Sequence, residues 1–420
     1  MKAGVLGNLL KNSSMMFVLN LATVGVGVLT IPITLKAIGV EAFGHLVLIQ
    51  AIASTIFTIC GFQYWQGMLV ALPGHRVEPD LLRQNIWRSL RYETIGVSAV
   101  LLGCLVLAII ELPQTGKFSF GDMVLLALSV VLPVMGTQTA YYRLINRYSM
   151  LMLAGLLTNV AKLGLLHWAA HGEPSIHATA LAYGLPEVLR AMVLFGYIVC
   201  AKRGIDGTLD GSQIPIQRLK DAGRWSTLQA IADLPVAHID RIIIGFTLPG
   251  AALGVFAILK RIFSLVNLAT APFYSTSIPE FAAYANKGDY AASFRLWRRT
   301  MILLFGATLG SAVICYLAMP IWMPLIFPGL ADYPAELAVV LLTAVAAGTF
   351  ITTHSFHWGL GKLRQAALIT VVTNIIYLVL LAALTFAFGL IGTVSAFLVH
   401  VLLAASIKII ILKRFEGAHV

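Results

Sequence analysis

Charged side chains inside long apolar runs are the residues of this sequence whose chemistry needs an explanation. Lys260 lies about nine residues beyond a short turn at 248–254, roughly 13 Å into a hydrocarbon layer about 30 Å thick if the run is helical. A charge at that depth costs about 2.5–3.5 kcal/mol on insertion scales, so it must face protein or water. Lys162 and Arg190 are cations in two other apolar runs. The three could bind an anionic group such as a pyrophosphate, Arg through its planar fork and Lys as a point charge.

The same cations could instead close ion pairs and belong to the scaffold. The acidic residues available inside the apolar runs are Glu187, Asp233 and Asp240. Glu187 and Arg190 are three residues apart and share a helix face. Asp233 and Glu187 are also candidates for a coupling proton or sodium ion, because burial favours the protonated form of a carboxyl. The sequence leaves both interpretations open, and pairing with Lys or Arg is the simpler one for these two acids.

Polar and aromatic residues recur beside the cations. A continuous helix would place Lys260 on one polar or small face together with residues 264, 267, 271 and 274. An earlier run carries a similar stripe through Gln50 and Tyr64, and Asn159 is three residues from Lys162. We therefore expect an internal cavity, and its predicted polar and aromatic lining is Gln50, Tyr64, Asn159, Asn267 and Tyr274.

Enzyme chemistry is not indicated. The sequence has no Walker-type glycine loop, no Gly-x-Ser-x-Gly elbow and no His-Glu-x-x-His motif. The four cysteines are isolated in apolar runs without metal-ligand spacing. We expect no catalytic residues, no metal and no cofactor, so energy for transport would come from an ion gradient, the membrane potential or the substrate gradient.

The composition is that of an integral membrane protein. Hydrophobic residues make up 59% of the 420 residues and charged residues 11%, whereas soluble domains carry about 25% charged residues. Apolar windows of about 20 residues predict an all-α protein with twelve membrane spans. The predicted spans lie near 13–36, 42–71, 91–111, 121–142, 150–170, 178–200, 226–248, 252–275, 300–323, 335–358, 366–388 and 391–412.

The basic residues predict the orientation of these spans. With the N-terminus inside, 22 of the 29 Lys and Arg residues fall in inside segments, and only Lys36 and Lys117 fall in outside loops. The positive-inside rule then predicts that both termini are cytoplasmic. This asymmetry accounts for most of the net charge of +11, so a nucleic-acid partner is not needed to explain it.

The two halves of the sequence resemble each other. Residues of the same type lie 210 positions apart at four places, which are Gly44 and Gly254, Ser54 and Ser264, Tyr64 and Tyr274, and Trp87 and Trp297. We predict two pseudo-symmetric six-helix lobes, 1–200 and 225–420, joined by a cytoplasmic linker at 201–224. An even number of spans per lobe orients both lobes the same way, and a substrate is then expected in the central cavity between them.

Three short motifs resemble a known family. They are Leu-Lys-Ala-Ile-Gly-Val-Glu-Ala-Phe-Gly-His-Leu at 35–46, Asp-Arg-Ile-Ile-Ile-Gly at 240–245, and Leu-Gly-Val-Phe-Ala-Ile at 253–258. They resemble the polysaccharide exporters of the multidrug/oligosaccharidyl-lipid/polysaccharide (MOP) exporter superfamily, in particular O-antigen flippases. The lipid II flippases of that superfamily carry two additional helices, so the twelve predicted spans argue against that branch.

The resemblance implies a function. It implies alternating access between two lobes in the bacterial inner membrane and transfer of an undecaprenyl-pyrophosphate-linked oligosaccharide from the cytoplasmic to the periplasmic leaflet. In that family buried cations are thought to hold the pyrophosphate, and Lys162, Arg190 and Lys260 occupy suitable places without matching an invariant motif. The expected partners are this lipid-linked glycan, a proton or sodium ion, the bilayer and other polysaccharide-assembly membrane proteins.

Two other functions compete with this one. A drug or cation antiporter of the same superfamily needs an acidic cavity, and the excess of buried cations speaks against it. A membrane glycan polymerase or glycosyltransferase normally places its catalytic residues in a sizeable outside loop, whereas the predicted outside loops are short.

Overall fold

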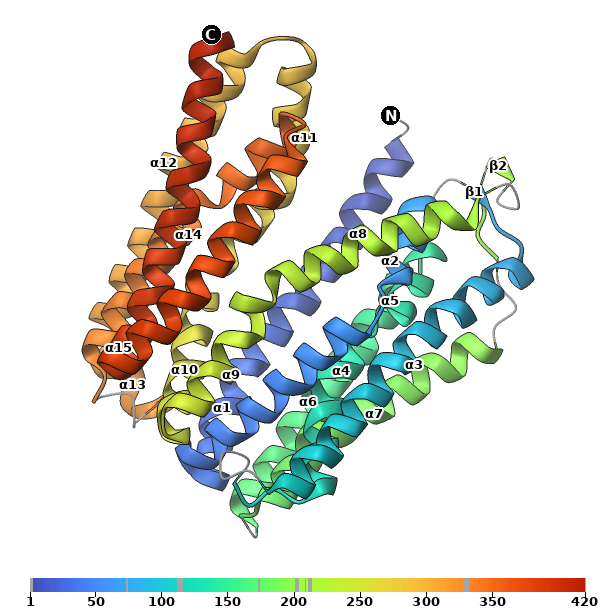
Figure 1. Ribbon diagram of the computed structural model, residues 1–420. Coiled ribbons are helices and arrows are strands. Elements are labelled where there is room, and N and C mark those ends of the chain that lie inside the picture. The colour runs from blue at the N-terminus through green and yellow to red at the C-terminus, as the bar shows by residue number, and fades with distance from the viewer. Residues whose placement is uncertain are drawn as a thin grey trace. The chain divides into compact units, whose positions relative to one another are not determined.

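The computed structural model describes residues 3–72, 75–111, 116–172, 174–200, 204–207, 209–210, 214–327 and 332–419. Nearly all of them are helical, as expected for apolar runs that must satisfy their backbone hydrogen bonds internally in a bilayer. The chain forms two compact units, Met1–Leu234 and Pro235–Val420, which run from blue to yellow-green and from yellow-green to red in Figure 1.

The first unit contains eight helices and one small sheet among the described residues. Its helices are α1 (Ala3–Cys60), α2 (Tyr64–Ala71), α3 (Pro79–Ile110), α4 (Phe120–Val134), α5 (Gly136–Leu144), α6 (Tyr148–His171), α7 (Ile176–Cys200) and α8 (Ile216–Leu234). Strands β1 (His75–Arg76) and β2 (Leu209–Asp210) pair in parallel. Tyr64, Tyr141 and Tyr142 are the largest buried side chains of its core cluster.

The second unit begins with a π-helix. Its elements are η3 (Pro235–Ile239), α9 (Asp240–Thr247), α10 (Gly250–Val266), the 3₁₀ turn η4 (Leu268–Thr270), α11 (Ala271–Asn286), α12 (Tyr290–Leu317), α13 (Met319–Ile326), α14 (Pro334–Gly359) and α15 (Leu363–His419). One of its core clusters is aromatic: Trp297 of α12 stacks on Phe356 of α14 with ring centroids 5.3 Å apart.

The two longest helices are hairpins, each divided at a glycine. Gly389 of α15 has φ 63° and ψ −139°, and His400 Nδ1 lies 3.2 Å from the Thr373 carbonyl oxygen although 27 residues separate them. In a straight helix these residues would be about 40 Å apart, so α15 folds back on itself. Gly39 (φ 76°, ψ 168°) divides α1 in the same way (Figure 1).

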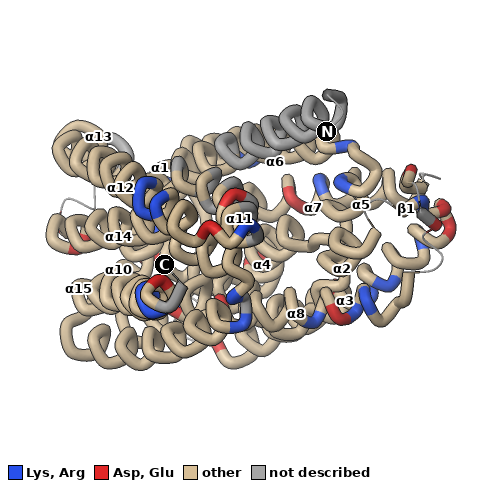
Figure 2. The backbone as a smooth tube through the Cα atoms, turned by 90° about the horizontal axis from the view of Figure 1, so that it is seen from above, with Lys and Arg blue, Asp and Glu red and all other residues tan. Residues whose placement is uncertain are grey.

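Eight helices of the described chain are long and apolar enough to cross a membrane. Two of these are the hairpins α1 and α15, whose arms correspond to the predicted spans one and two and spans eleven and twelve. Charged positions are sparse among the helices (Figure 2), and large apolar side chains such as Ile109, Ile302 and Phe386 are exposed, as lipid-facing residues would be. The protein is thus an all-α polytopic membrane protein, while the count of twelve spans remains a prediction.

The predicted seventh span, 226–248, is not one α-helix. The helix begins ten residues earlier, at Ile216, which lies within the predicted linker, and it ends at Leu234. The π-helix η3 follows and then α9. Pro235 has no backbone N–H and its ring crowds the preceding turn, so the regular α-helical pattern is interrupted there. The other described residues of the predicted linker include β2, and residues 201–203, 208 and 211–213 lie outside the described chain.

The predicted stripe from Lys260 to Tyr274 is also wrong as one continuous helical face. Helix α10 ends at Val266, and η4 separates it from α11. Two local hydrogen bonds compete with the helix there: Asn267 Nδ2 donates to the Phe263 carbonyl (3.1 Å), and Thr270 Oγ1 donates to the Asn267 carbonyl (2.7 Å). Pro272 adds a residue without an N–H.

Candidate functional site

The clearest charged cluster of the first unit joins α6 and α7. Lys162 Nζ lies 3.2 Å from Glu187 Oε1, and Arg190 Nε lies 3.0 Å from Glu187 Oε2. The side chains of Lys162, Glu187 and Arg190 are only 14%, 8% and 16% exposed. Helix periodicity places Glu187 and Arg190 on one face of α7, and α6 packs beside α7. One carboxylate therefore bridges two of the three predicted cations.

Polar contacts extend this cluster to α1. Lys162 Nζ lies 5.7 Å from the centre of the Tyr183 ring, and the Tyr183 hydroxyl lies 3.0 Å from Thr34 Oγ1 of α1. One turn from Lys162, the buried Asn159 donates from Nδ2 to Thr23 Oγ1 at 3.2 Å. Three helices of the first unit thus meet through polar side chains.

Positive charge exceeds negative charge in the cluster. Two cations share one carboxylate, which leaves a formal charge of +1. Arg190 Nη2 is buried and has no hydrogen-bond partner among the described residues. The guanidinium can therefore donate to a further acceptor without giving up Glu187.

The third predicted cation is in the second unit and is fully engaged. Lys260 Nζ of α10 lies 3.0 Å from Asp240 Oδ2 and donates to the Val236 carbonyl of η3 at 3.1 Å. Its ammonium is also 4.1 Å from the centre of the Phe397 ring, within the range of a cation–π contact. The Asp240 side chain has no exposed surface. This geometry agrees with the alternative in which Lys260 closes an ion pair with Asp240 and belongs to the scaffold.

Further groups surround this ion pair. The buried Tyr377 hydroxyl of α15 approaches Asp240 without hydrogen-bond geometry, and its ring centroid is 4.8 Å from that of His400. Arg241 acts electrostatically on Lys260 and adds a second cation. The π-helix supplies the carbonyl that Lys260 uses, so the departure of η3 from an α-helix has a local role.

The remaining predicted residues are dispersed. Gln50 Nε2 donates to Ser129 Oγ of α4 at 3.0 Å. Tyr64 lies in the first unit's core, where its hydroxyl donates to Asn85 Oδ1 at 2.8 Å, and not on a cavity wall. Asn267 donates a hydrogen bond to the Phe263 carbonyl of the helix that precedes it. Asp233 is an exposed residue in the last turn of α8. The Tyr274 side chain lies outside the described part of the structure.

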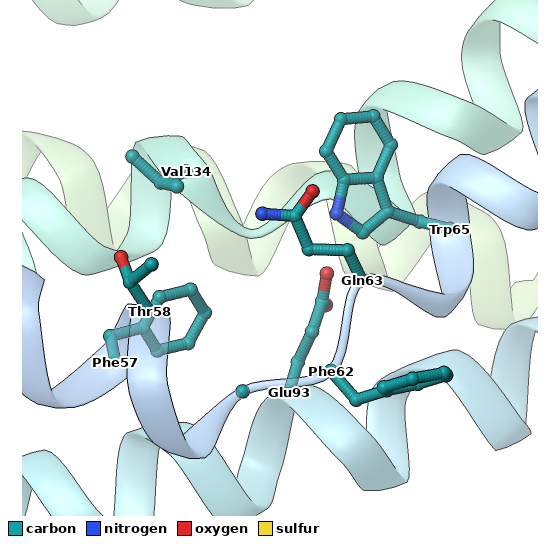
Figure 3. Close-up of a pocket in the computed structure, with 8 residues that line it drawn as sticks. Phe57, Thr58, Phe62, Gln63, Trp65, Glu93 and Val134 are labelled. Carbon is teal, nitrogen blue, oxygen red and sulfur yellow. The ribbon is translucent and has the colours of Figure 1, made fainter. Parts of the chain in front are cut away.

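A cavity in the first unit is lined in part by Glu93, a residue that the sequence analysis missed. It has a volume of about 360 Å³, part of which is open to the surroundings. Its lining is Phe57, Thr58, Gly61, Phe62, Gln63, Trp65, Glu93 and Val134 (Figure 3). The only available signal was an acidic residue two positions inside the third predicted span, after Arg91.

Comparison with known proteins gives the fold class. No family model and no curated protein matches the chain by sequence. Solved structures do match, and they are transporters of the MOP superfamily. One is an inward-facing multidrug resistance transporter of the MATE family, with a TM-score of 0.69 at 14% identity over 94% of this chain and 95% of that one.

Two further structures support the same fold. The lipid II flippase MurJ in an inward closed conformation gives a TM-score of 0.70 at 11% identity over 94% of this chain and 87% of MurJ. A variant of the Vibrio cholerae MATE transporter VcmN gives 0.59 at 14% identity over 99% and 98% of the two chains. The chain is therefore a multi-pass membrane protein with the fold of MOP superfamily transporters.

Proposed function

We propose that the protein is a flippase that moves an undecaprenyl-pyrophosphate-linked oligosaccharide, such as an O-antigen or exopolysaccharide repeat unit, from the cytoplasmic to the periplasmic leaflet of the bacterial inner membrane. It does so by alternating access driven by an ion gradient. The similarity to both MATE transporters and MurJ fits a transporter of this superfamily and leaves the cargo to be argued from the residues.

The observation that carries the proposal is the charge of the Lys162–Glu187–Arg190 cluster. Two cations meet one carboxylate, and Arg190 keeps a buried donor, Nη2, without a partner. A pyrophosphate offers several acceptor oxygens and negative charge, so it complements this surplus. A cationic drug would be repelled by it, which argues against the antiporter alternative.

The cluster also has a defined state without cargo. Glu187 holds both cations when no phosphate is present, so neither is buried alone. Binding of a pyrophosphate would transfer part of the electrostatic pairing of the two cations from Glu187 to the cargo. Lys260 has less to offer, since Asp240, the Val236 carbonyl and Phe397 already occupy it. We assign cargo binding to Lys162 and Arg190. We assign to Lys260 a structural role as the partner of Asp240.

The test is leaflet transfer of a fluorescent lipid-pyrophosphate sugar in vesicles containing the purified protein. Arg190→Gln and Lys162→Met should each lower the transfer rate by about 10- to 100-fold, because a hydrogen bond to a charged group contributes about 1.5–3 kcal/mol. Arg224→Gln is the matched control, since Arg224 makes the same i, i+3 pair with Asp221 on an exposed surface. Its rate should equal that of the wild type.

Two results would contradict the proposal. If the wild type moves no lipid but exports cationic dyes, the antiporter function replaces the flippase function. If Arg190→Gln and Lys162→Met both keep the wild-type rate, the assigned binding residues are wrong even though a flippase remains.

A further inference from the structure

Glu93 has a buried carboxyl group in which one oxygen accepts a hydrogen bond and the other has no hydrogen-bond partner among the described residues. The residue, on α3, is 2% exposed. Its Oε1 accepts a hydrogen bond from the backbone N–H of Thr137 at 2.9 Å. Its Oε2 is buried and has no hydrogen-bond partner among the described residues. An unpaired carboxylate oxygen away from water is costly and needs a reason.

Glu93 lies where two helices of the first unit are interrupted. Helix α1 ends at Cys60, residues 61–63 are not helical, and α2 starts at Tyr64. Helix α4 ends at Val134, one residue after Pro133, and α5 starts at Gly136. Thr137 supplies one of the first N–H groups of α5, which have no partner within that helix. Glu93 thus caps α5 from a different helix, where a negative charge is favourable.

Glu93 belongs to the cavity lining. Figure 3 shows the Glu93 carboxyl group pointing toward the side chain of Gln63, which comes from the interruption between α1 and α2. Phe57, Phe62 and Trp65 supply most of the apolar surface. The cavity is thus lined by the ionisable group of Glu93 and by residues at both helix interruptions, Gln63 at one and Val134 at the other.

The groups that act on Glu93 carry no charge. They are the Thr137 hydroxyl and the Thr137 and Gly136 backbone, all on α5. No titratable side chain among the described residues of α1, α2, α4 or α8 acts on Glu93. On α2 the Tyr64 hydroxyl bonds Asn85, and on α3 Arg88 acts on Tyr64 and Tyr92 lies beside Tyr64.

We propose that Glu93 is a proton-binding site that exchanges its proton through this cavity. Neutralisation by a proton removes the cost of a buried carboxylate that no cation pairs with, and it gives Oε2 an O–H to donate. A metal cation fits less well. Thr58 and Gln63 are the only other lining residues with side-chain oxygens, whereas Ca²⁺ and Mg²⁺ take six or more oxygen ligands.

Protonation has a structural consequence. The charged form caps the N-terminus of α5 more strongly than the neutral form, since a helix N-terminus favours negative charge. The proton therefore weakens the capping of α5 by Glu93. Its use as the coupling ion rests on the proposed transport function, and it moves that role from Glu187, which already bridges two cations. Proton binding itself does not depend on the cargo.

The experiment is infrared difference spectroscopy of the purified full-length protein in lipid nanodiscs during a pH titration. The carbonyl stretch of a protonated carboxylic acid should be present at low pH and lost at high pH in the wild type. Glu93→Gln should lack it, and Glu93→Asp should show a shifted band and serve as the variant that keeps an acid in place. Asp122→Asn is the control and should keep the titrating band. Asp122 is also buried, but both of its oxygens accept hydrogen bonds, from Ser119 and His177.

Several outcomes decide the matter. A band that persists in Glu93→Gln, or a wild type with no titrating band, would overturn the proposal. Loss of the band on replacing choline chloride with sodium chloride at constant pH would show that sodium displaces the proton and would overturn the proton as the coupling ion. In vesicles with a pH gradient, Glu93→Gln should lose the gradient dependence of lipid transfer. A wild type that binds the proton but moves no lipid would refute the transport function and leave the site intact.

Discussion

The buried ion pairs decide which acidic and basic residues depend on one another. Glu187 is the only carboxylate that Lys162 and Arg190 are shown to share in the described chain. Removing one partner of a buried pair leaves an uncompensated charge, which is much costlier than removing both. The bridging acid should therefore be the most sensitive position of the cluster.

We expect Glu187→Gln to lower the free energy of unfolding by about 3–5 kcal/mol, because it leaves two cations unpaired. Lys162→Met should cost less, since Glu187 keeps Arg190 at 3.0 Å. Thermal unfolding in detergent followed by intrinsic fluorescence measures both. The control is Asp221→Asn, which opens the exposed pair with Arg224 and should cost at most about 1 kcal/mol. Equal effects of Glu187→Gln and Asp221→Asn would show that burial does not matter here.

The second unit offers a sharper test, because its ion pair joins one acid to one cation. Asp240→Asn should cost about 3–5 kcal/mol by stranding Lys260. Adding Lys260→Met should recover most of that loss, since neither charge is then buried alone. Urea unfolding in detergent gives the double-mutant cycle. An additive double variant would mean that the 3.0 Å pair does not couple the two residues.

The sequence could only partly predict these sites. It named Glu187, Asp233 and Asp240 as the possible partners, but Lys162 and Glu187 are 25 residues apart on different helices, so packing and not helix periodicity pairs them. Glu93 could not be singled out at all. One glutamate near the end of an apolar run is equally consistent with an interface, and only the fold shows that it is buried beside two helix interruptions.

At the scale of helices, hydropathy predicted where apolar segments lie better than where they stop being α-helical. The runs around Gly39 and Gly389 were correctly split into two spans each, because a turn at each glycine separates stretches of spanning length. The π-helix at Pro235 and the 3₁₀ turn at Leu268–Thr270 were not predicted. The first depends on the missing N–H of Pro235, and the second on hydrogen bonds from the Asn267 and Thr270 side chains to the backbone. Hydropathy is insensitive to both.

The two hairpin glycines should be intolerant of a side chain. Gly39 and Gly389 adopt positive φ with extended ψ, a region that is essentially restricted to glycine and costs other residues about 1–3 kcal/mol. We expect Gly39→Ala and Gly389→Ala each to lower stability by that amount in thermal unfolding. Gly164→Ala is the matched control: Gly164 lies inside α6 with open space around its Cβ position, so alanine should stabilise by up to about 1 kcal/mol. Stabilisation by all three substitutions would contradict the assigned hairpin turns.

At the scale of the molecule, composition determined more than any motif. With 11% charged residues the chain is apolar enough to lie in a bilayer, where its backbone groups must be satisfied internally, as they are in helices. The three structures compared have similar folds although they are only 11–14% identical to the chain. The predicted lobe bounds 1–200 and 225–420, the number of spans and the orientation in the membrane remain predictions. The last of these depends on the distribution of basic residues alone.

That distribution makes a direct prediction about topology. Lys117 precedes α4 in a predicted outside loop, and Arg218 lies in α8 in a segment predicted to be cytoplasmic. In a variant whose four native cysteines are replaced, since Cys60 and Cys200 are exposed, Lys117→Cys should react with a membrane-impermeant maleimide in intact spheroplasts. Arg218→Cys should react only after permeabilisation, because the positive-inside rule keeps its basic segment in the cytoplasm. The opposite labelling pattern would invert the orientation, and the proposed direction of lipid transfer would then have to be measured anew.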